Sequence, residues 1–199
     1  MKKNHGRFNI ICLMKSVFME LLMIIETERL LITTFSPDMA ESVYRNSLDD
    51  DNRRFVPDEV FETVEAAENI ITAITSFYGK SEMPQIYAVL LREGNQHIGH
   101  VQAVPIKSGW EVGYHIGKDF TKMGYATEAV KAFLPEIMRQ LDITEIHGIC
   151  HADNIASKKV LENCGFTLVR QEKSLIKRIC SRFTLFSGQH RVSYIFEIK

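Results

Sequence analysis

The strongest pattern in the chain is a strand followed by an amphipathic helix, between Glu111 and Leu141. Val112, Tyr114 and Ile116 place β-forming side chains at alternating positions, which is typical of a strand. After a short loop, apolar residues recur at helical spacing. These residues are Ala126, Ala129, Val130, Phe133, Leu134, Ile137, Met138 and Leu141. The pattern therefore predicts a strand–loop–helix unit as the centre of the fold.

Pro135 lies inside this predicted helix. Proline has no N–H group, and its ring clashes with the carbonyl of Lys131, at a cost of about 3 kcal/mol in a helix interior. We expect a kink or local repacking at this point. Because Pro135 is far along the helix from the preceding loop, the loop should keep its geometry.

The rest of the chain alternates between helix-like and strand-like patterns. Helices are expected after the capping residue Ser36, from about Val64 to Gly79, and around 156–163. Strand patterns occupy 25–34, 85–91, 96–106, 144–150, 166–173, 182–187 and 190–198. No internal repeat or linker interrupts this order, so it predicts one α/β domain over residues 25–199.

Residues 1–24 form an N-terminal extension without an assigned role. Basic residues precede apolar ones here, as in a signal peptide, but Lys15 and Glu20 interrupt the apolar stretch and no small-residue cleavage site follows. The uncharged runs are also too short to span a membrane. We expect the extension to be dispensable for chemistry, with Met19 or Met23 as the natural start; a short amphipathic helix is the alternative.

Composition narrows the class of protein. A chain of 199 residues with 45% hydrophobic content can bury one core, and a net charge of −1 gives no basic field for nucleic acid. The four cysteines are scattered, which predicts neither a disulfide framework nor a zinc site and fits a reducing cytoplasm. Strand alternation would place His147 and His151 on one face and Cys150 on the other, so we predict no metal there.

The loop before the central helix is a candidate anion site. A helix N-terminus has N–H groups without intrahelical partners and a positive dipole end. Gly124 and Ala126 are small enough to let an anion approach the backbone, and Lys122 adds a charge. An ordinary strand–loop–helix turn is the alternative, and spacing alone favours it because one glycine is a weak signal.

Three blocks in order carry a resemblance to a known family. Segments 111–117 (EVGYHIG) and 124–129 (GYATEA) resemble the acetyl-CoA-binding motif of the GNAT superfamily of N-acetyltransferases. Segments 154–157 (NIAS) and 165–166 (GF) are similar to a motif of its RimJ/RimL-type group, and 26–32 (ETERLLI) is similar to that group's first strand. The resemblance implies a single-domain GNAT fold, with a mixed, mostly antiparallel central sheet flanked by helices.

The resemblance also implies how acetyl-CoA binds as cosubstrate. The backbone around His115 and Ile116 would pair with the pantetheine amides like an added strand. Backbone N–H groups at the start of the helix would cradle the pyrophosphate. The residues implied are Thr121, Lys122, Met123, Gly124, Tyr125, Ala126 and Thr127. The family usually has Arg or Gln where this chain has Thr121, so weaker binding is expected, since backbone donors carry most of the site.

Glu111 is the candidate general base. It stands on the central strand where many GNAT enzymes carry a glutamate that deprotonates the amine, often through water. An exposed carboxylate with a pKa near about 4.3 is a poor base, so burial beside Trp110 or Tyr114 would have to raise that pKa. A solvated glutamate at a strand end is the alternative, and Glu172 is the second candidate for the base.

Ser157 and Asn154 are the candidates for the leaving-group side. Many GNAT enzymes have a tyrosine acid for the thiolate, but Leu161 stands at that position here. In the RimJ/RimL-type group the serine of the Asn-x-x-Ser motif is proposed to bond the sulfur, which implies Ser157 as donor. Asn154 would orient the acetyl donor or a water, and both would contact the cofactor. Local helix capping is the alternative for both residues.

The segment from Asp49 to Glu68 is rich in acids. It carries only Arg53 and Arg54 against eight carboxylates. These are Asp49, Asp50, Asp51, Asp58, Glu59, Glu62, Glu65 and Glu68. In GNAT folds this region resembles the part that covers the acceptor, so an acidic rim would attract a cationic amine. Solvated helix faces are the alternative.

These observations predict a cytoplasmic acetyltransferase that moves the acetyl group of acetyl-CoA to a primary amine by direct attack, without a metal and without a covalent acyl-enzyme. The acceptor is a protein N-terminal α-amine or a small cationic amine such as an aminoglycoside. Thr121 and Leu161 suggest a CoA-binding sensor with little turnover as the alternative. Residues 1–24 suggest a further alternative, a structural protein that docks on a partner through this extension. Tyr194 and Phe196 on an exposed last hairpin would suit a homodimer edge.

Overall fold

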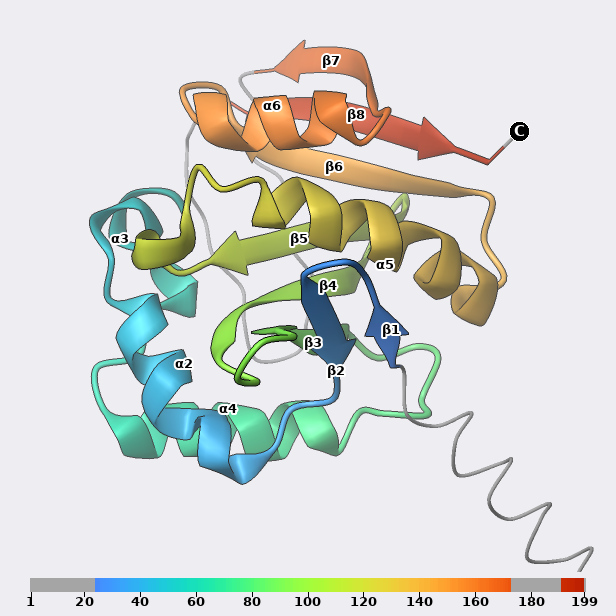
Figure 1. Cartoon of the computed structure of the whole chain (residues 1–199). Helices are drawn as coiled ribbons and strands as arrows, with labels where there is room; N and C mark the ends of the chain where they lie inside the picture. The colour runs from blue at the N-terminus through green and yellow to red at the C-terminus, as the bar shows by residue number, and fades with distance from the viewer. Residues whose placement is uncertain (1–23, 173–190, 199) are drawn as a thin grey trace, which may run out of the picture.

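The computed structural model describes residues 24–172 and 191–198. Its strands form one eight-stranded sheet in the order β1-β2-β3-β4-β5-β6-β8-β7 (Figure 1). The strands are β1 (Ile25–Glu26), β2 (Leu30–Thr33), β3 (Gln85–Leu91), β4 (His97–Ile106), β5 (Gly109–Ile116), β6 (Glu145–His151), β7 (Thr167–Glu172) and β8 (Arg191–Glu197). All neighbouring strands are antiparallel except β5 and β6. The predicted mixed, mostly antiparallel α/β sheet is confirmed.

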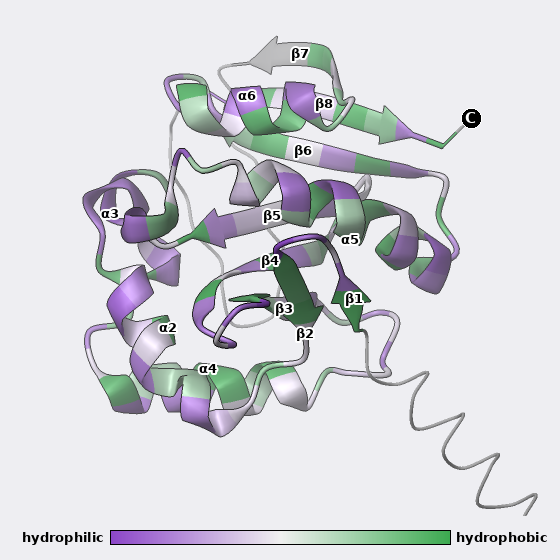
Figure 2. Cartoon of the chain, viewed as in Figure 1, coloured by the Kyte–Doolittle hydropathy of each residue, from purple (hydrophilic) through white to green (hydrophobic). Residues whose placement is uncertain are grey.

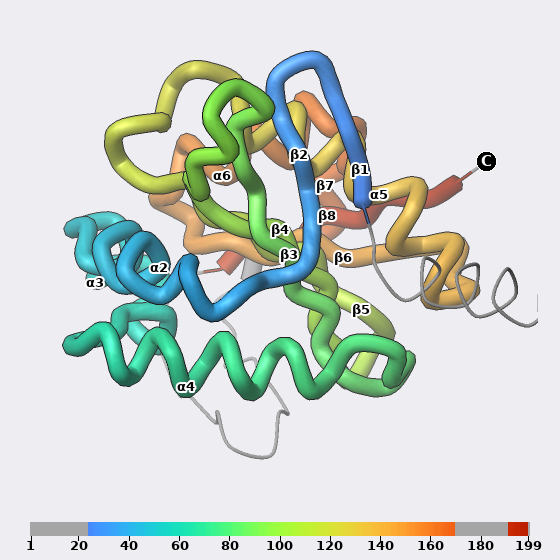
Figure 3. The backbone as a smooth tube through the Cα atoms, turned by 60° about the horizontal axis from the view of Figure 1, so that its bottom comes forward, coloured from blue at the N-terminus to red at the C-terminus, as the bar shows by residue number. Residues whose placement is uncertain are grey.

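Helices cover both faces of this sheet. They are α2 (Ala40–Ser47), α3 (Asp50–Phe55), α4 (Val64–Thr75), α5 (Tyr125–Leu141) and α6 (Ile155–Asn163), with 3-10 turns η1 (Pro37–Met39), η2 (Pro57–Glu59) and η3 (Lys118–Phe120). Helix α5 packs on β2, β4 and β5, and α6 packs on α5 and β6. Helices α2, α3 and α4 lie together on the other side (Figure 3). The sheet therefore separates a layer of α5 and α6 from a layer of α2, α3 and α4.

The core follows the apolar periodicity. On the α5 side, the helical stripe is buried, as predicted, at Ala129, Val130, Phe133, Leu134, Ile137 and Met138. A second, smaller cluster lies under α2 and α4, at Phe35, Ala40, Ala67, Ile71, Ile74, Ala88 and Leu90. Hydrophobic residues gather in β2 and β3 between these layers, whereas α3 is mostly hydrophilic (Figure 2). Burial of these two faces is the main stabilising term of the fold.

The first predicted strand is in fact a tight hairpin. Strand β1 pairs antiparallel with β2, because Thr27–Arg29 turns the chain. The Thr27 N–H donates to the Leu30 carbonyl at 2.9 Å, and the Leu30 N–H donates to Thr27 Oγ1 at 2.8 Å. A polar side chain that hydrogen-bonds nearby backbone groups competes with the hydrogen bonds of a continuous strand. The alternation of apolar residues did not reveal this turn.

Two further local features differ from a simple reading of the pattern. Helix α3 occupies a stretch expected to be a loop; Asp49 caps it by accepting the Asn52 N–H at 2.7 Å. Helix α5 continues through Pro135 as a single element. In both cases the surrounding tertiary structure outweighs the local sequence preference, which favoured a loop before α3 and a kink at Pro135.

The suggested dimer edge is wrong. Strand β8 lies between β6 and β7 and pairs with both, so it is not an edge strand. Tyr194 is buried in the core on the α6 side, and its hydroxyl donates to Glu162 Oε1 at 3.2 Å. The strand expected at 182–187 and the extension 1–23 lie outside the described residues. Within 24–172 and 191–198, no helix is long and apolar enough to cross a membrane.

Candidate active site

The two parallel strands β5 and β6 separate part-way along their length. Their register pairs Glu111 with His147 and Val112 with Gly148, and the ladder ends there. Beyond Val112, β5 continues to Ile116 with β4 as its ladder partner (Figure 1). The backbone edge of 113–116 therefore faces an opening between the strands, which we call the fork. An extended chain of amides can add to such an edge as a strand would.

The loop between β5 and α5 presents a helix N-terminus beside the fork. Lys122 and Gly124 both adopt left-handed backbone conformations, with φ of 64° and 84°. The helical ladder of α5 begins with the Glu128 N–H, which donates to the Gly124 carbonyl at 3.1 Å. The preceding N–H groups, over 124–127, thus point out of the helix end. The backbone has the form expected for the pyrophosphate cradle.

The side chains around this cradle leave room for an anion. A Cβ placed on Gly124 would have Arg29 Nη2 as its near neighbour, at 3.5 Å. Lys122 and Met123 are exposed. The Thr121 hydroxyl turns back and donates to the Lys118 carbonyl at 2.9 Å. The Thr121 side chain therefore stabilises the turn. Threonine in place of the Arg or Gln usual in the family leaves the backbone N–H donors in place.

The first and central motif blocks meet at this helix end. Glu128 accepts hydrogen bonds from the Thr27 hydroxyl at 2.6 Å and from Arg29 Nε at 2.7 Å. Arg29 Nη1 donates to the Met123 carbonyl at 3.0 Å, and its guanidinium lies 4.5 Å from the centre of the Tyr125 ring. Sequence reasoning missed this clamp, because the two blocks are far apart in the chain and no local spacing connects them.

Ser157 and Tyr114 face each other across the fork on the α5 side. The two hydroxyls are 2.8 Å apart, and the Tyr114 hydroxyl also lies 2.9 Å from the Ser157 carbonyl. Burial raises the pKa of Tyr114 well above its usual range, although the bond to Ser157 acts in the other direction. Tyr114 therefore stays protonated at neutral pH and can donate. No signal from spacing marked Tyr114 as a partner of Ser157.

Asn154 caps α6. Its side-chain oxygen accepts the Ser157 N–H at 2.9 Å, which is the capping arrangement raised as the alternative for this residue. Leu161, at the position where many GNAT enzymes have a tyrosine, is 1% exposed. It packs so closely that a Cβ on Gly148 would lie 2.5 Å from its Cδ2. Leu161 therefore fills the core beneath β6.

Cys150 lies on the face of β6 opposite to His147 and His151, so these three side chains do not converge on one point. His147 and His151 alternate with Cys150 along β6, and burial raises the pKa of the Cys150 thiol to about 11. A protonated thiol is a poor nucleophile. Within the described ranges, no group of three or more His, Cys, Asp or Glu side chains could hold a metal ion.

Glu111 is buried at the base of the fork, with 3% of its surface exposed. It belongs to the last paired part of β5 and lies opposite His147 in the parallel register. Because side chains alternate along a strand, Glu111 and His115 share the face opposite Val112 and Tyr114. That is the face covered by α3. Glu172, the second candidate base, lies on β7 in register with Arg191, and its side chain is outside the described part.

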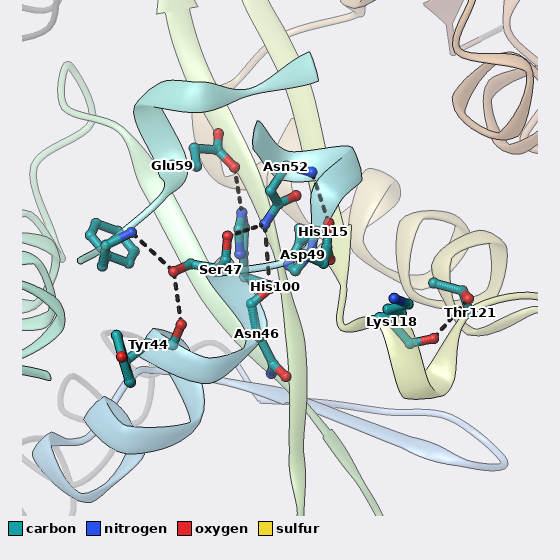
Figure 4. A network of polar contacts seen from close by, with 11 residues as sticks. Tyr44, Asn46, Ser47, Asp49, Asn52, Glu59, His100, His115, Lys118 and Thr121 are labelled. Carbon is teal, nitrogen blue, oxygen red and sulfur yellow. Dashed lines mark hydrogen bonds and ion pairs between the residues drawn. The ribbon is translucent and has the colours of Figure 1, made fainter. Parts of the chain in front are cut away.

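The acidic segment divides into two groups. Asp50, Asp51, Glu62, Glu65 and Glu68 are exposed. Asp49 and Glu59 instead turn toward the sheet, where Asp49 Oδ2 lies 3.2 Å from His115 Nε2 and Glu59 Oε2 lies 3.7 Å from His100 Nε2. Figure 4 shows these contacts, with Asn52 and Ser47 joining the same network. The face of the sheet that carries Glu111 is thus polar over β4 and β5.

Comparison with known proteins agrees with this geometry. The family model of the acetyltransferase (GNAT) domain matches residues 29–167. The uncharacterized N-acetyltransferase YnaD of Bacillus subtilis (strain 168) is 28% identical over 143 residues, which cover 71% of this chain and 81% of YnaD. The residues matched by the family model include the first motif block from Arg29, the fork and the start of α5.

Solved structures share the fold. The crystal structure of a GNAT-family acetyltransferase from Bacillus anthracis has a TM-score of 0.71 at 24% identity, and the match covers 88% of this chain and 98% of that chain. RimL, a ribosomal L7/L12 α-N-protein acetyltransferase in complex with coenzyme A, has a TM-score of 0.70 at 19% identity, over 88% of this chain and 98% of that one.

This chain belongs to the GNAT family of acetyltransferases. The predicted family, GNAT fold and transferase class are confirmed, whereas the RimJ/RimL-type group stays a prediction.

Proposed function

We propose that this protein transfers the acetyl group of acetyl-CoA to a primary amine by direct attack within a ternary complex. The observation that carries the proposal is the pairing of two features on one strand–loop–helix unit. The β5–β6 ladder opens after Val112, and the left-handed Gly124 ends the same loop at the start of α5. Together they offer an amide edge and an anion cradle at neighbouring positions.

In this proposal the backbone holds the donor. The edge around His115 and Ile116 pairs with the pantetheine amides, and the N–H groups from Lys122 to Thr127 receive the pyrophosphate. Lys122 adds a positive charge at the cradle. The clamp of Arg29 on Glu128 and on the Met123 carbonyl fixes the loop before any ligand arrives, which reduces the ordering that binding requires.

Glu111 is the proposed base. A primary amine is mainly an ammonium ion at neutral pH, and it must lose a proton before its lone pair can attack the thioester carbon. Glu111 is buried at the base of the fork, on the face that carries the acceptor in our proposal. Its carboxylate takes the proton directly or through one water.

Ser157 is the proposed donor to the departing sulfur. As the C–N bond forms and the C–S bond breaks, the thiolate needs a proton or a hydrogen bond. The Ser157 hydroxyl is 2.8 Å from that of Tyr114, which stays protonated and holds Ser157 in place by a hydrogen bond. Asn154 supports this role by fixing the Ser157 backbone at the start of α6.

The proposed acceptor is a cationic amine in the cytoplasm. The exposed carboxylates of α3 and α4 give the acceptor side a negative rim, which attracts ammonium groups before deprotonation. Among the fold neighbours, RimL is named for α-amino acetylation of a ribosomal protein, and this makes a protein N-terminus one class to test beside small polyamines and aminoglycosides.

The test is release of the CoA thiol from acetyl-CoA against polyamines, aminoglycosides, amino acids and short peptides with free N-termini. We expect amine-dependent release by the full chain and none by Gly124→Glu. Binding of acetyl-CoA, measured as a rise in melting temperature, without release by any amine would contradict the proposal and favour a CoA-binding sensor. We also propose residues 25–199 as the catalytic domain; a chain that begins at Met23 should then release thiol at the same rate.

A further inference from the structure

The face of the sheet beneath α3 holds two histidine–carboxylate pairs. His115 on β5 meets Asp49 at the start of α3, and His100 on β4 meets Glu59 on η2. The two rings are 5.9 Å apart, because the antiparallel register of β4 and β5 places these residues opposite each other. Figure 4 shows both pairs between the strands and the helical segment that covers them.

The Asp49–His115 pair is held in place on both sides. Asp49 Oδ1 accepts the Asn52 N–H at 2.7 Å as the cap of α3, so Oδ2 is left facing His115 Nε2 at 3.2 Å. Burial pushes the pKa of Asp49 upward, but the hydrogen bonds from His115 and the Asn52 N–H outweigh it and keep this pKa below its usual value. Asp49 is therefore a fixed anion at neutral pH.

This contact selects one form of the imidazole ring. A carboxylate accepts hydrogen bonds, so the neutral ring must carry its proton on Nε2, and the lone pair is left on Nδ1. An imidazole oriented by a carboxylate is the arrangement of a general base whose imidazolium form is stabilised once it takes a proton. The His115 side chain remains 13% exposed and that of Asp49 12%, so part of the pair borders solvent.

The neighbouring histidines do not compete for the proton. Burial, with additional repulsion from His115 and His97, lowers the pKa of His100 to about 3. Burial likewise lowers the pKa of His97 to about 4. Both stay neutral in the physiological range, while Asp49 lies against His115 and Glu59 against His100.

His115 is also placed on the open part of β5. It lies beyond the last registered pair with β6, whereas Glu111 belongs to that paired part. The two side chains share one face and are four residues apart, which corresponds to about 13 Å along a strand at about 3.3 Å per residue. In our inference the amine therefore lies between Glu111 and His115, on the α3 side of the fork.

We infer that His115 is a second catalytic base of the acetyl transfer, with Asp49 as its positioning residue. This role depends on the transfer proposed above. The ammonium proton moves to His115 Nδ1, which gives an imidazolium paired with Asp49, and the amine lone pair attacks the thioester carbon. The C–S bond breaks, the nitrogen loses its remaining extra proton to the departing sulfur through Ser157, and His115 returns its proton to water. One proton is released for each amide formed.

The test compares His115→Gln, Asp49→Asn and the double variant Glu111→Gln/His115→Gln, with Asp119→Asn as a control at an exposed aspartate beyond β5. Glutamine can still bond Asp49 but cannot take a proton, and asparagine still caps α3. The assay is thiol release with the amine of the panel above that gives the highest kcat/KM. We expect His115→Gln to lower kcat by about 10²-fold with the KM for acetyl-CoA unchanged.

Asp49→Asn separates a catalytic role from a structural one. Loss of the anion makes the imidazole a weaker base, so the rising limb of kcat/KM against pH should move to lower pH while kcat falls about tenfold. The double variant should lose more than either single variant, because the two bases partly replace each other. A pair that only ties α3 to the sheet would lower the melting temperature and leave the position of the limb unchanged, which would overturn the inference.

A measurement independent of turnover completes the test. Ring ¹⁵N shifts of the full chain should show His115 protonated on Nε2 at neutral pH and should lose this preference in Asp49→Asn. A ring protonated on Nδ1 would overturn the role of His115. If no amine gives turnover, the acetyl transfer itself fails. If amines turn over and His115→Gln retains the wild-type kcat, only the second base fails.

Discussion

On the α5 side of the fork, the groups that can hold acetyl-CoA belong to the backbone, whereas on the α3 side the polar groups are side chains. The cradle depends on the conformation of Gly124 and on the free end of a helix. The opposite face depends on Glu111, His115 and Asp49. A backbone site tolerates many side chains, and Thr121 illustrates this. A side-chain site changes with each substitution, so the acceptor side is where members of one fold can diverge.

The largest expected effect is on the backbone side. Gly124→Glu should weaken acetyl-CoA binding by more than about 10²-fold, measured by calorimetry, because it puts an anion where we propose that the pyrophosphate binds and strains a left-handed position. Gly94→Glu is the matched control: Gly94 has a similar φ of 79°, and a Cβ there meets nothing within 4 Å. Equal affinity in both variants would contradict the cradle.

On the acceptor side, Glu111→Gln should lower kcat by about 10²-fold with little change in acetyl-CoA affinity, because it removes a base and keeps the side-chain volume. Glu145→Gln, an exposed glutamate at the start of β6, serves as control. An unchanged kcat would show that Glu111 is structural, and Glu172 would then be the next residue to substitute.

A smaller effect is expected where the two sides meet, at the Tyr114–Ser157 pair. Ser157→Ala and Tyr114→Phe should each lower kcat by about tenfold, and the double variant should lose less than the product of the two, because both act on one proton. Single-turnover measurements of thiol release would show the effect in the chemical step. A pair that only caps α6 would lower thermal stability without changing that step.

The smallest effect concerns the clamp behind the cradle. Burial raises the pKa of Glu128, but the hydrogen bonds of Thr27 and Arg29 outweigh this effect and hold the pKa below its ordinary value of 4.5. Its stabilising contribution is therefore complete above that value and is lost as the pH falls through the lowered pKa. Glu128→Gln should cost about 1 kcal/mol of unfolding free energy at neutral pH, and the loss should shrink in acid. Glu136→Gln, at a half-buried position of the same helix where the side chain pairs with Arg139, should cost less.

Much of the fold could be predicted from local pattern. The buried stripe of α5 and the alternation of β5 follow from apolar spacing alone. The hairpin at Thr27 and the helix at Asp50 could not be predicted in this way, because each depends on a polar side chain that bonds nearby backbone. The position of β8 between β6 and β7 could not be predicted either, because periodicity shows which face of a strand is buried but not which strands lie beside it.

For the candidate site, the sequence by itself marked the start of α5 as a candidate anion site, through Gly124 and the motif resemblance. It also marked Glu111, Ser157 and Asn154 as candidates through the motif resemblance. Only the tertiary structure decided that Arg29 clamps Glu128, that Tyr114 meets Ser157, and that Asp49 meets His115. These partners are separated by 43 or more positions in the chain, and the packing of both layers on one sheet brings them together.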